Sequence, residues 1–278
     1  MDLFAPVVEK EKLHHNFLST LDPTAAGIRA VLSEWAQGFE DRDGKFVREF
    51  QTSYNSTFWE LYLFAVLKQL GFEIDFSFDT PDFVSANYPV AVEAAIAGHA
   101  IDDPPEWPKT LAVLANKDLA ARRKASMIRL SNAFMAKSKA FRKRYAVLPH
   151  MAGRSYIVAI SNFGTQDFYL QGDAPMQRLL FDIDKEKVIH KPNGAPVPLG
   201  LFRSDAYGHI SAVLYSSLAT FGKARALGKD EGDITFRAMR KKEGEKPIYI
   251  DAPKADYQES LTDGLRKSCL GPRRRQKP

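Results

Sequence analysis

Three acidic residues lie where the surrounding sequence makes a carboxylate unusual. Glu60 falls in an expected helix over 54–70 whose apolar side chains would occupy every face. A lone ionised carboxylate is so costly to bury that Glu60 should be neutral, paired or bound to a metal ion, unless the first turns of the helix keep it near water. Asp82 begins a short strand-like segment, and Glu93 lies within another at 90–97.

The alternation of side chains along 90–97 isolates Glu93 on a face of small residues. That face also carries Ala91, Ala95 and Ala97. If this strand pairs with the one that begins at Asp82, the two chains lie ~4.8 Å apart. Two carboxylates at that spacing can share one hard divalent cation. In the alternative interpretation both carboxylates face solvent on an exposed sheet.

The elements that would position these residues follow from apolar periodicity and turn residues. Three consecutive strands form a predicted meander, and an amphipathic helix and further strands follow. The expected elements are a helix at 23–37, a helix at 54–70, strands at 72–78, 82–85 and 90–97, a helix at 117–145, a strand at 154–161, an insertion at 165–208, a last core strand at 210–217 and a short strand at 246–250.

This order predicts an α/β fold with one principal domain. We expect an N-terminal helical extension over 1–50, a core over 51–222 and a C-terminal extension over 223–278 that ends in a disordered basic tail. The insertion is a candidate dimer contact or a candidate substrate clamp.

The composition of the 278 residues is that of a globular protein, with 45% hydrophobic and 26% charged residues. Cys269 is the only cysteine, which excludes an internal disulfide and a thiolate cluster for zinc or iron–sulfur, and favours a reducing, cytoplasmic location. Neither a secretory signal nor a membrane span is expected, because the longest apolar stretch is about half the ~20 residues that a span requires.

Positive charge is concentrated in two regions of a chain whose formal net charge is +5. Residues 266–278 contain six basic residues and no acidic one, and residues 117–144 contain ten basic residues and one acidic one. Such a distribution can accommodate a polyanion, although a charged helix is often only a solvated face.

Together these features resemble the PD-(D/E)XK nuclease superfamily. The resemblance rests on an acidic residue in a leading helix, then Pro81-Asp82-Phe83, then Val92-Glu93-Ala94, followed by a helix and a strand, and it covers roughly residues 54–163. It implies a restriction-endonuclease-like mixed sheet core flanked by helices. It further implies that Asp82 and Glu93 bind Mg²⁺ or Mn²⁺, and that Glu60 assists them or holds a second ion.

One residue departs from the family pattern, because Ala95 stands where the family has a lysine. Either a basic group arrives from another element, or the site does not cleave. Lys137 is the expected donor, since at ~100° per residue it falls beside the apolar stripe of the helix at 117–145 whereas Lys139 points away. Gln51, just upstream of the leading helix, is a candidate for orienting water.

The leading hypothesis is therefore a magnesium-dependent endonuclease or exonuclease that hydrolyses phosphodiester bonds, with DNA as the expected substrate. The alternatives are a nuclease-like module that binds nucleic acid or protein without catalysis, and a structural protein with a solvated acidic sheet. No GxSxG, P-loop or GxGxxG motif supports a serine hydrolase, a P-loop NTPase or a dinucleotide-binding enzyme. The residues expected to contact phosphates are Arg122, Arg123, Arg129, Lys139, Arg142, Arg273, Arg274 and Arg275.

Overall fold

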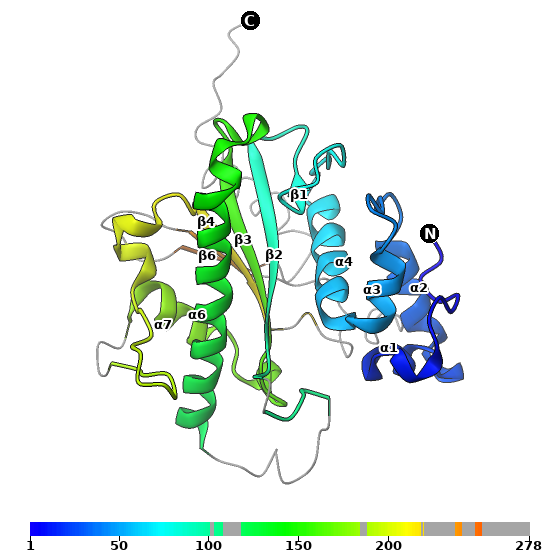
Figure 1. The fold of residues 1–278 in the computed structure, drawn as a ribbon, viewed down its shortest axis with the longest axis horizontal. Helices are drawn as coiled ribbons and strands as arrows, with labels where there is room; N and C mark the ends of the chain where they lie inside the picture. Colours follow the sequence, from blue (N-terminus) through cyan, green and yellow to red (C-terminus); the bar gives the residue numbers. More distant parts are fainter. Residues whose placement is uncertain are drawn as a thin grey trace, which may run out of the picture.

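The computed structural model describes residues 1–100, 103–107, 118–183, 188–217 and 219, together with the backbone of two strands at 237–240 and 248–251. It is an α/β structure in which helices flank a mixed sheet (Figure 1). The six strands lie in the order in which they occur along the chain. They are β1 (Phe83–Val84), β2 (Val90–Gly98), β3 (Ser155–Phe163), β4 (Ala212–Ser216), β5 (Arg237–Arg240) and β6 (Ile248–Asp251).

The directions of the strands explain the mixed character of the sheet. β1 is antiparallel to β2, the β2–β3 and β3–β4 pairs are parallel, and β4, β5 and β6 are successively antiparallel. A single antiparallel bridge joins Ile74 to Ser85 at the outer side of β1. The predicted meander is therefore present, although its first member is reduced to this bridge and its second to two residues.

Six α-helices and seven short 3-10 helices are found in the described residues. The α-helices are α1 (His15–Thr20), α2 (Ala26–Trp35), α3 (Phe46–Thr52), α4 (Tyr54–Gln69), α6 (Leu119–Lys143) and α7 (Ala174–Phe181). The 3-10 helices are η1 (Lys10–Lys12), η2 (Pro23–Ala25), η3 (Tyr145–Val147), η4 (Pro149–Met151), η5 (Phe168–Leu170), η6 (Leu201–Arg203) and η7 (Asp205–Tyr207).

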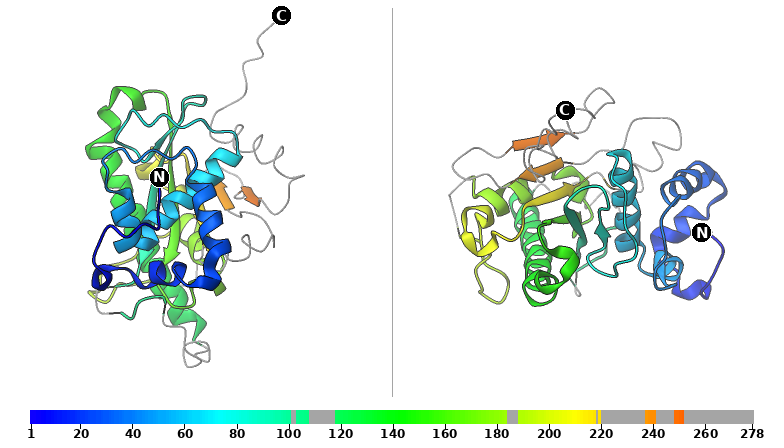
Figure 2. Two further views of the ribbon diagram at one scale, coloured as in Figure 1. Left: turned by 90° about the vertical axis from the view of Figure 1, so that its right-hand side faces the viewer. Right: turned by 90° about the horizontal axis from the view of Figure 1, so that it is seen from above.

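The two faces of the sheet bury two separate apolar clusters because successive strand residues point to opposite sides. Val92 and Ala94 pack with α4 and the N-terminal helices, whereas Ala91 and Ala95 pack with α6 and α7. Figures 1 and 2 show α4 on one side of β2, with α1–α3 beyond it, and α6 on the other side. The site described below lies where these two layers meet the short strand β1.

Helix α4 is buried on nearly all sides because it packs between the sheet and a second layer of helices. Toward the sheet, Trp59 Nε1 donates a hydrogen bond to the Ala159 carbonyl at 3.1 Å. Toward the N-terminal helices, the ring of Tyr62 meets that of Trp35 with centroids 5.2 Å apart. The all-round apolar pattern predicted this covering, while Glu60 itself stays partly exposed.

The structure changes several expected boundaries and roles. The helix predicted at 23–37 is a 3-10 turn followed by α2. The strand predicted at 210–217 is β4, but it is not the last strand of the sheet, because β5 and β6 follow it. β6 overlaps the strand predicted at 246–250. The segment 165–208, expected to be an insertion, contributes α7 and η6 to the core against α6. Residues from Gly271 onward lie outside the described residues.

In the part of the chain that the structure describes, every helix is too short or too polar to cross a membrane.

Candidate active site

The pairing of β1 with β2 brings Asp82 and Glu93 together. Phe83 pairs with Val92, so continuing this antiparallel register by one residue sets Asp82 opposite Glu93. Asp82 Oδ2 accepts a hydrogen bond from the Ala94 backbone N–H at 2.7 Å, and the Asp82 backbone N–H lies 3.4 Å from Glu93 Oε2. The two side chains thus converge at the open end of β1.

Glu93 is held by two donors on one of its carboxylate oxygens. Lys137 Nζ of α6 lies 2.7 Å from Glu93 Oε1, and the Tyr145 hydroxyl of η3 donates to the same oxygen at 3.0 Å. The Glu93 side chain is 5% exposed, so these bonds form largely away from water. With Oε1 engaged, Oε2 is the oxygen that faces Asp82.

The prediction from helical spacing placed Lys137 near Glu93, and this is where Lys137 lies. Its ammonium group pairs with Glu93 although the lysine expected on the strand itself is replaced by Ala95. Lys139, two residues further along α6, is exposed, as its angular position indicated. A cation from the neighbouring helix therefore stands beside the acidic pair.

The carboxyl groups of Asp82 and Glu60 have raised pKa values because each is buried close to another carboxyl group. Burial, and then the charge of Glu93, raises the pKa of Asp82 to about 6. Burial, and then the charge of Asp82, raises the pKa of Glu60 to about 8, while Lys137 acts in the opposite direction on both. Three acids with one nearby ammonium group favour either bound protons or an added cation.

Two solvent-connected hollows meet at Glu60. The acidic hollow, about 460 Å³ in volume, lies between α3, α4 and the segment that leads into β1. It is lined by Phe39, Glu40, Asp41, Arg42, Asp43, Phe46, Glu49, Glu60, Asp79 and Asp82. The alanine hollow, about 290 Å³ in volume, lies between α4 and α6 and is lined by Ser56, Trp59, Glu60, Ala94, Ala95, Ile96, Ala133, Ala136 and Lys137. Asp82 and Glu60 therefore line hollows that open to solvent, whereas Glu93 lies buried behind them.

The donor set of this site suits a hard divalent cation. Carboxylate oxygens of Asp82 and Glu93 are the ligand type that Mg²⁺ and Mn²⁺ prefer, and Mg²⁺ is commonly held by only one or two carboxylates with water completing its shell. Across the described residues, no three His, Cys, Asp or Glu side chains already converge as a complete ligand set. The site thus offers a pair of carboxylates, with Glu60 nearby.

Tyr145 is a site residue that the sequence reasoning missed. It was counted as a member of the apolar stripe of the predicted helix at 117–145, and its ring is indeed buried. The α-helix ends at Lys143, and the following turn η3 directs the hydroxyl group at Glu93. A buried tyrosine needs a hydrogen-bond partner for its hydroxyl group, and this requirement was the signal that could have identified Tyr145 as a site residue.

Gln51 does not orient water at this site. Its side chain is buried, accepts a hydrogen bond from the Val7 N–H, and donates to the carbonyls of Leu3 and Ala5. Gln51 therefore anchors the N-terminal segment against α3.

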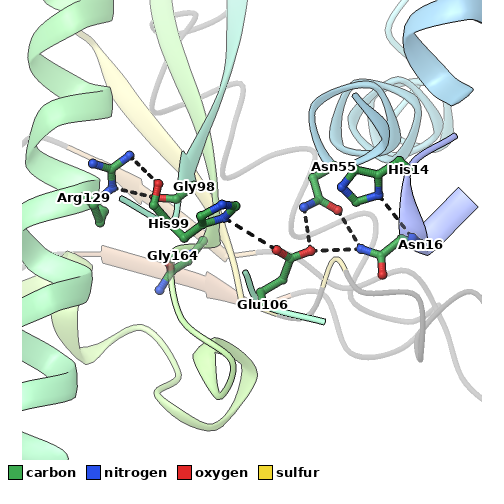
Figure 3. Close-up of polar contacts among 9 residues, drawn as sticks. His14, Asn16, Asn55, Gly98, His99, Glu106, Arg129 and Gly164 are labelled. Atoms are coloured by element: carbon green, nitrogen blue, oxygen red, sulfur yellow. Dashed lines mark hydrogen bonds and ion pairs between the residues drawn. The ribbon is translucent and has the colours of Figure 1, made fainter. Parts of the chain in front are cut away.

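Two of the arginines predicted to contact phosphates have internal partners instead. Arg122 forms an ion pair with Asp167, whose side chain is 4% exposed. Arg129 donates to the carbonyls of Gly98 and His99 at the end of β2 (Figure 3). Arg129 therefore ties α6 to the end of β2, and Arg122 ties it to the segment that follows β3, so both have internal partners where phosphate contacts were predicted.

Of the other residues predicted to contact phosphates, three are exposed on α6 and three lie outside the described residues. Arg123, Lys139 and Arg142 are exposed on α6. Arg273, Arg274 and Arg275 lie outside the described residues. The helix thus retains exposed cations for a polyanion.

A second buried carboxylate, Glu106, lies apart from this site in a polar cluster near the start of α4. Its Oε1 accepts hydrogen bonds from the side-chain amides of Asn16 at 2.9 Å and Asn55 at 2.6 Å (Figure 3). His99 Nδ1 lies 3.9 Å from Oε2. These contacts join the end of β2 to α1 and α4, and we assign them a structural role.

Comparisons of the chain with protein-family models, with curated proteins and with solved structures gave no match.

Proposed function

We propose that this protein is a metal-dependent nuclease that hydrolyses phosphodiester bonds, most simply those of DNA. The observation that carries the proposal is the convergence of Asp82, just before β1, with Glu93 of β2 and Lys137 of α6, beside two hollows that open to solvent. Asp82 and Glu93 would hold Mg²⁺ or Mn²⁺ between them. When bound, the ion would lower the pKa of a water molecule and offset charge on the phosphate.

The chain's own residues supply the remaining roles in this proposal. Tyr145 and Lys137 both donate to Glu93 Oε1 and thereby orient its other oxygen toward Asp82. The Lys137 ammonium group, whose side chain is 28% exposed, would also donate to a phosphate oxygen or to the attacking water. Glu60 would either hold a proton near neutral pH or become a ligand of a second ion.

The arrangement of the elements supports a restriction-endonuclease-like core. α4 precedes β1 and β2, α6 follows them, and β3 then pairs with β2 in parallel. This is the element order that the resemblance implied. β5 and β6, together with the N-terminal helices, would be additions to that core.

The proposal is tested by replacing each carboxylate with its amide. Purified wild type, Asp82→Asn and Glu93→Gln are incubated with plasmid and oligonucleotide DNA in Mg²⁺ or Mn²⁺. We expect cleavage by the wild type and a loss of at least about a hundredfold in both variants, because each loses a charged ligand. Glu73→Gln, an exposed residue of the adjoining segment, is the matched control and should cleave as the wild type does. Equal activity in Glu93→Gln and wild type would refute the assignment.

The specific alternative is a nuclease-like module without catalysis, and Ala95 is the observation that favours it. Calorimetric titration with Mn²⁺ separates the two candidates. Binding that disappears in Asp82→Asn supports the enzyme. No binding at any pH up to about 9, which lies above the raised pKa values of Asp82 and Glu60, supports the module.

A further inference from the structure

The alanine hollow lies along a part of β2 that β1 does not cover. β1 pairs only with Ala91 and Val92, and no strand in the described residues pairs with that edge of β2 beyond this point. The walls of the hollow come from α4 and α6, which lie on opposite sides of β2 (Figure 1). Small side chains on both β2 and α6 leave this space open.

The size and lining of the alanine hollow suit one nucleoside. Its volume of about 290 Å³ is near the lower end of the ~300–1,000 Å³ typical of small-molecule pockets. It has room for a base with its sugar and is too small for a base pair. The methyl groups of the alanines and the side chain of Ile96 give an apolar lining that does not distinguish one base from another, while Trp59 borders the hollow but is 1% exposed.

The charges around Glu60 determine on which side a nucleic acid can lie. The acidic hollow is lined by seven carboxylates and one cation, Arg42, so it repels a phosphate backbone. The alanine hollow has Lys137 in its wall, and Glu60 is the one carboxylate among its lining residues. A strand whose phosphate reaches Asp82 and Glu93 therefore continues across the alanine hollow.

We propose that the alanine hollow binds one unpaired nucleotide next to the phosphate that is cleaved, so that the substrate is a single strand or a frayed end. This inference rests on the proposed nuclease function. A base within a duplex cannot enter the hollow without being unpaired and unstacked, which opposes binding of an intact duplex. The substrate class thus follows from the size of the hollow and from its position beside Lys137.

The test fills the hollow with a larger side chain. Ala136 is exposed on α6 and lines the hollow, so Ala136→Phe should fold and occupy the space of a base. Ala121→Phe, at an exposed position of the same helix outside the hollow, is the control, and Ala136→Leu is a second variant. Circular dichroism and thermal unfolding establish that each variant is folded.

Binding is measured by fluorescence anisotropy with a short labelled single strand and with the same sequence as a blunt duplex, using Ca²⁺ in place of Mg²⁺. We expect the wild type to bind the single strand more tightly, and Ala136→Phe to weaken that binding by about tenfold or more. Ala121→Phe should leave it unchanged. A wild-type preference for the duplex, or single-strand binding by Ala136→Phe equal to that of the control, overturns the inference.

Cleavage in Mn²⁺ by the same proteins distinguishes this inference from the function on which it rests. If the wild type cleaves duplex DNA and Ala136→Phe cleaves it equally well, the result supports the proposed nuclease function and refutes the proposed nucleotide site. If the wild type cleaves nothing while Ala136→Phe loses single-strand binding, the result supports the nucleotide-binding site and refutes the proposed hydrolysis.

Discussion

Replacing Glu60 by glutamine should make the protein more stable at neutral and alkaline pH in the absence of divalent ions. The pKa of Glu60 is raised from 4.5 to about 8, first by burial and then by the charge of Asp82. Between these two values the folded protein keeps a proton that the unfolded chain releases. The free energy of unfolding of the wild type therefore falls as pH rises through this range.

The expected size of the effect follows from that difference in pKa. One bound proton changes the free energy of unfolding by at most ~1.4 kcal/mol per pH unit. From pH 5 to pH 8 the Glu60 proton accounts for about 2 to 4 kcal/mol, with the lower figure allowing for its mutual repulsion with Asp82. Glutamine fills nearly the same space and carries no charge, so the variant lacks this dependence.

Urea unfolding measured from pH 5 to pH 8 with a chelator present tests this prediction. The difference between Glu60→Gln and the wild type should be near zero at pH 5 and about 2 to 4 kcal/mol at pH 8. Glu34→Gln, at an exposed position of α2, should follow the wild-type curve. Parallel curves for Glu60→Gln and the wild type would show that Glu60 is ionised in the fold throughout this range, and the electrostatic account of the site would then be wrong.

Three further substitutions test the contacts around the site. Tyr145→Phe should lower Mn²⁺-dependent cleavage about tenfold and the free energy of unfolding by ~1 to 2 kcal/mol, because it removes one hydrogen bond to a buried carboxylate; kinetics and urea unfolding measure the two effects. Lys137→Met should reduce cleavage by about a hundredfold or more, and wild-type rates in this variant would remove Lys137 from the proposed mechanism. Arg122→Ala should destabilise the protein by ~3 to 5 kcal/mol in urea, because Asp167 stays buried without its partner, whereas the exposed Arg123→Ala should change stability by less than ~0.5 kcal/mol.

The features that sequence predicted best are those with a strong local pattern. The helix around Glu60 and the alternation around Glu93 each follow from residues near one another in the chain, and α4 and β2 lie close to the predicted boundaries. The placement of Lys137 beside Glu93 was also predictable, because helical geometry fixes which positions face the sheet. Local periodicity thus identified the elements and the faces that carry these residues, whereas their meeting at one site was expected from the family resemblance.

Contacts between distant segments were not predictable in this way. The charge run on α6 gave no sign that Arg122 would meet Asp167, which lies 45 residues further along the chain. Gln51 was expected at the site because of its place before α4, whereas its partners are carbonyls of the N-terminal segment. The end of α6 at Lys143, which frees Tyr145 to turn toward Glu93, depends on packing that sequence periodicity does not encode.

The central claim is that Asp82 and Glu93 share one divalent ion, and crystals soaked in Mn²⁺ test it most directly. Anomalous scattering should reveal a peak within ~2.0 to 2.3 Å of one carboxylate oxygen from each residue, and Asp82→Asn crystals treated in the same way should lack it. A wild-type map with no peak between these two carboxylates, at Mn²⁺ concentrations that load other sites in the crystal, would contradict the account.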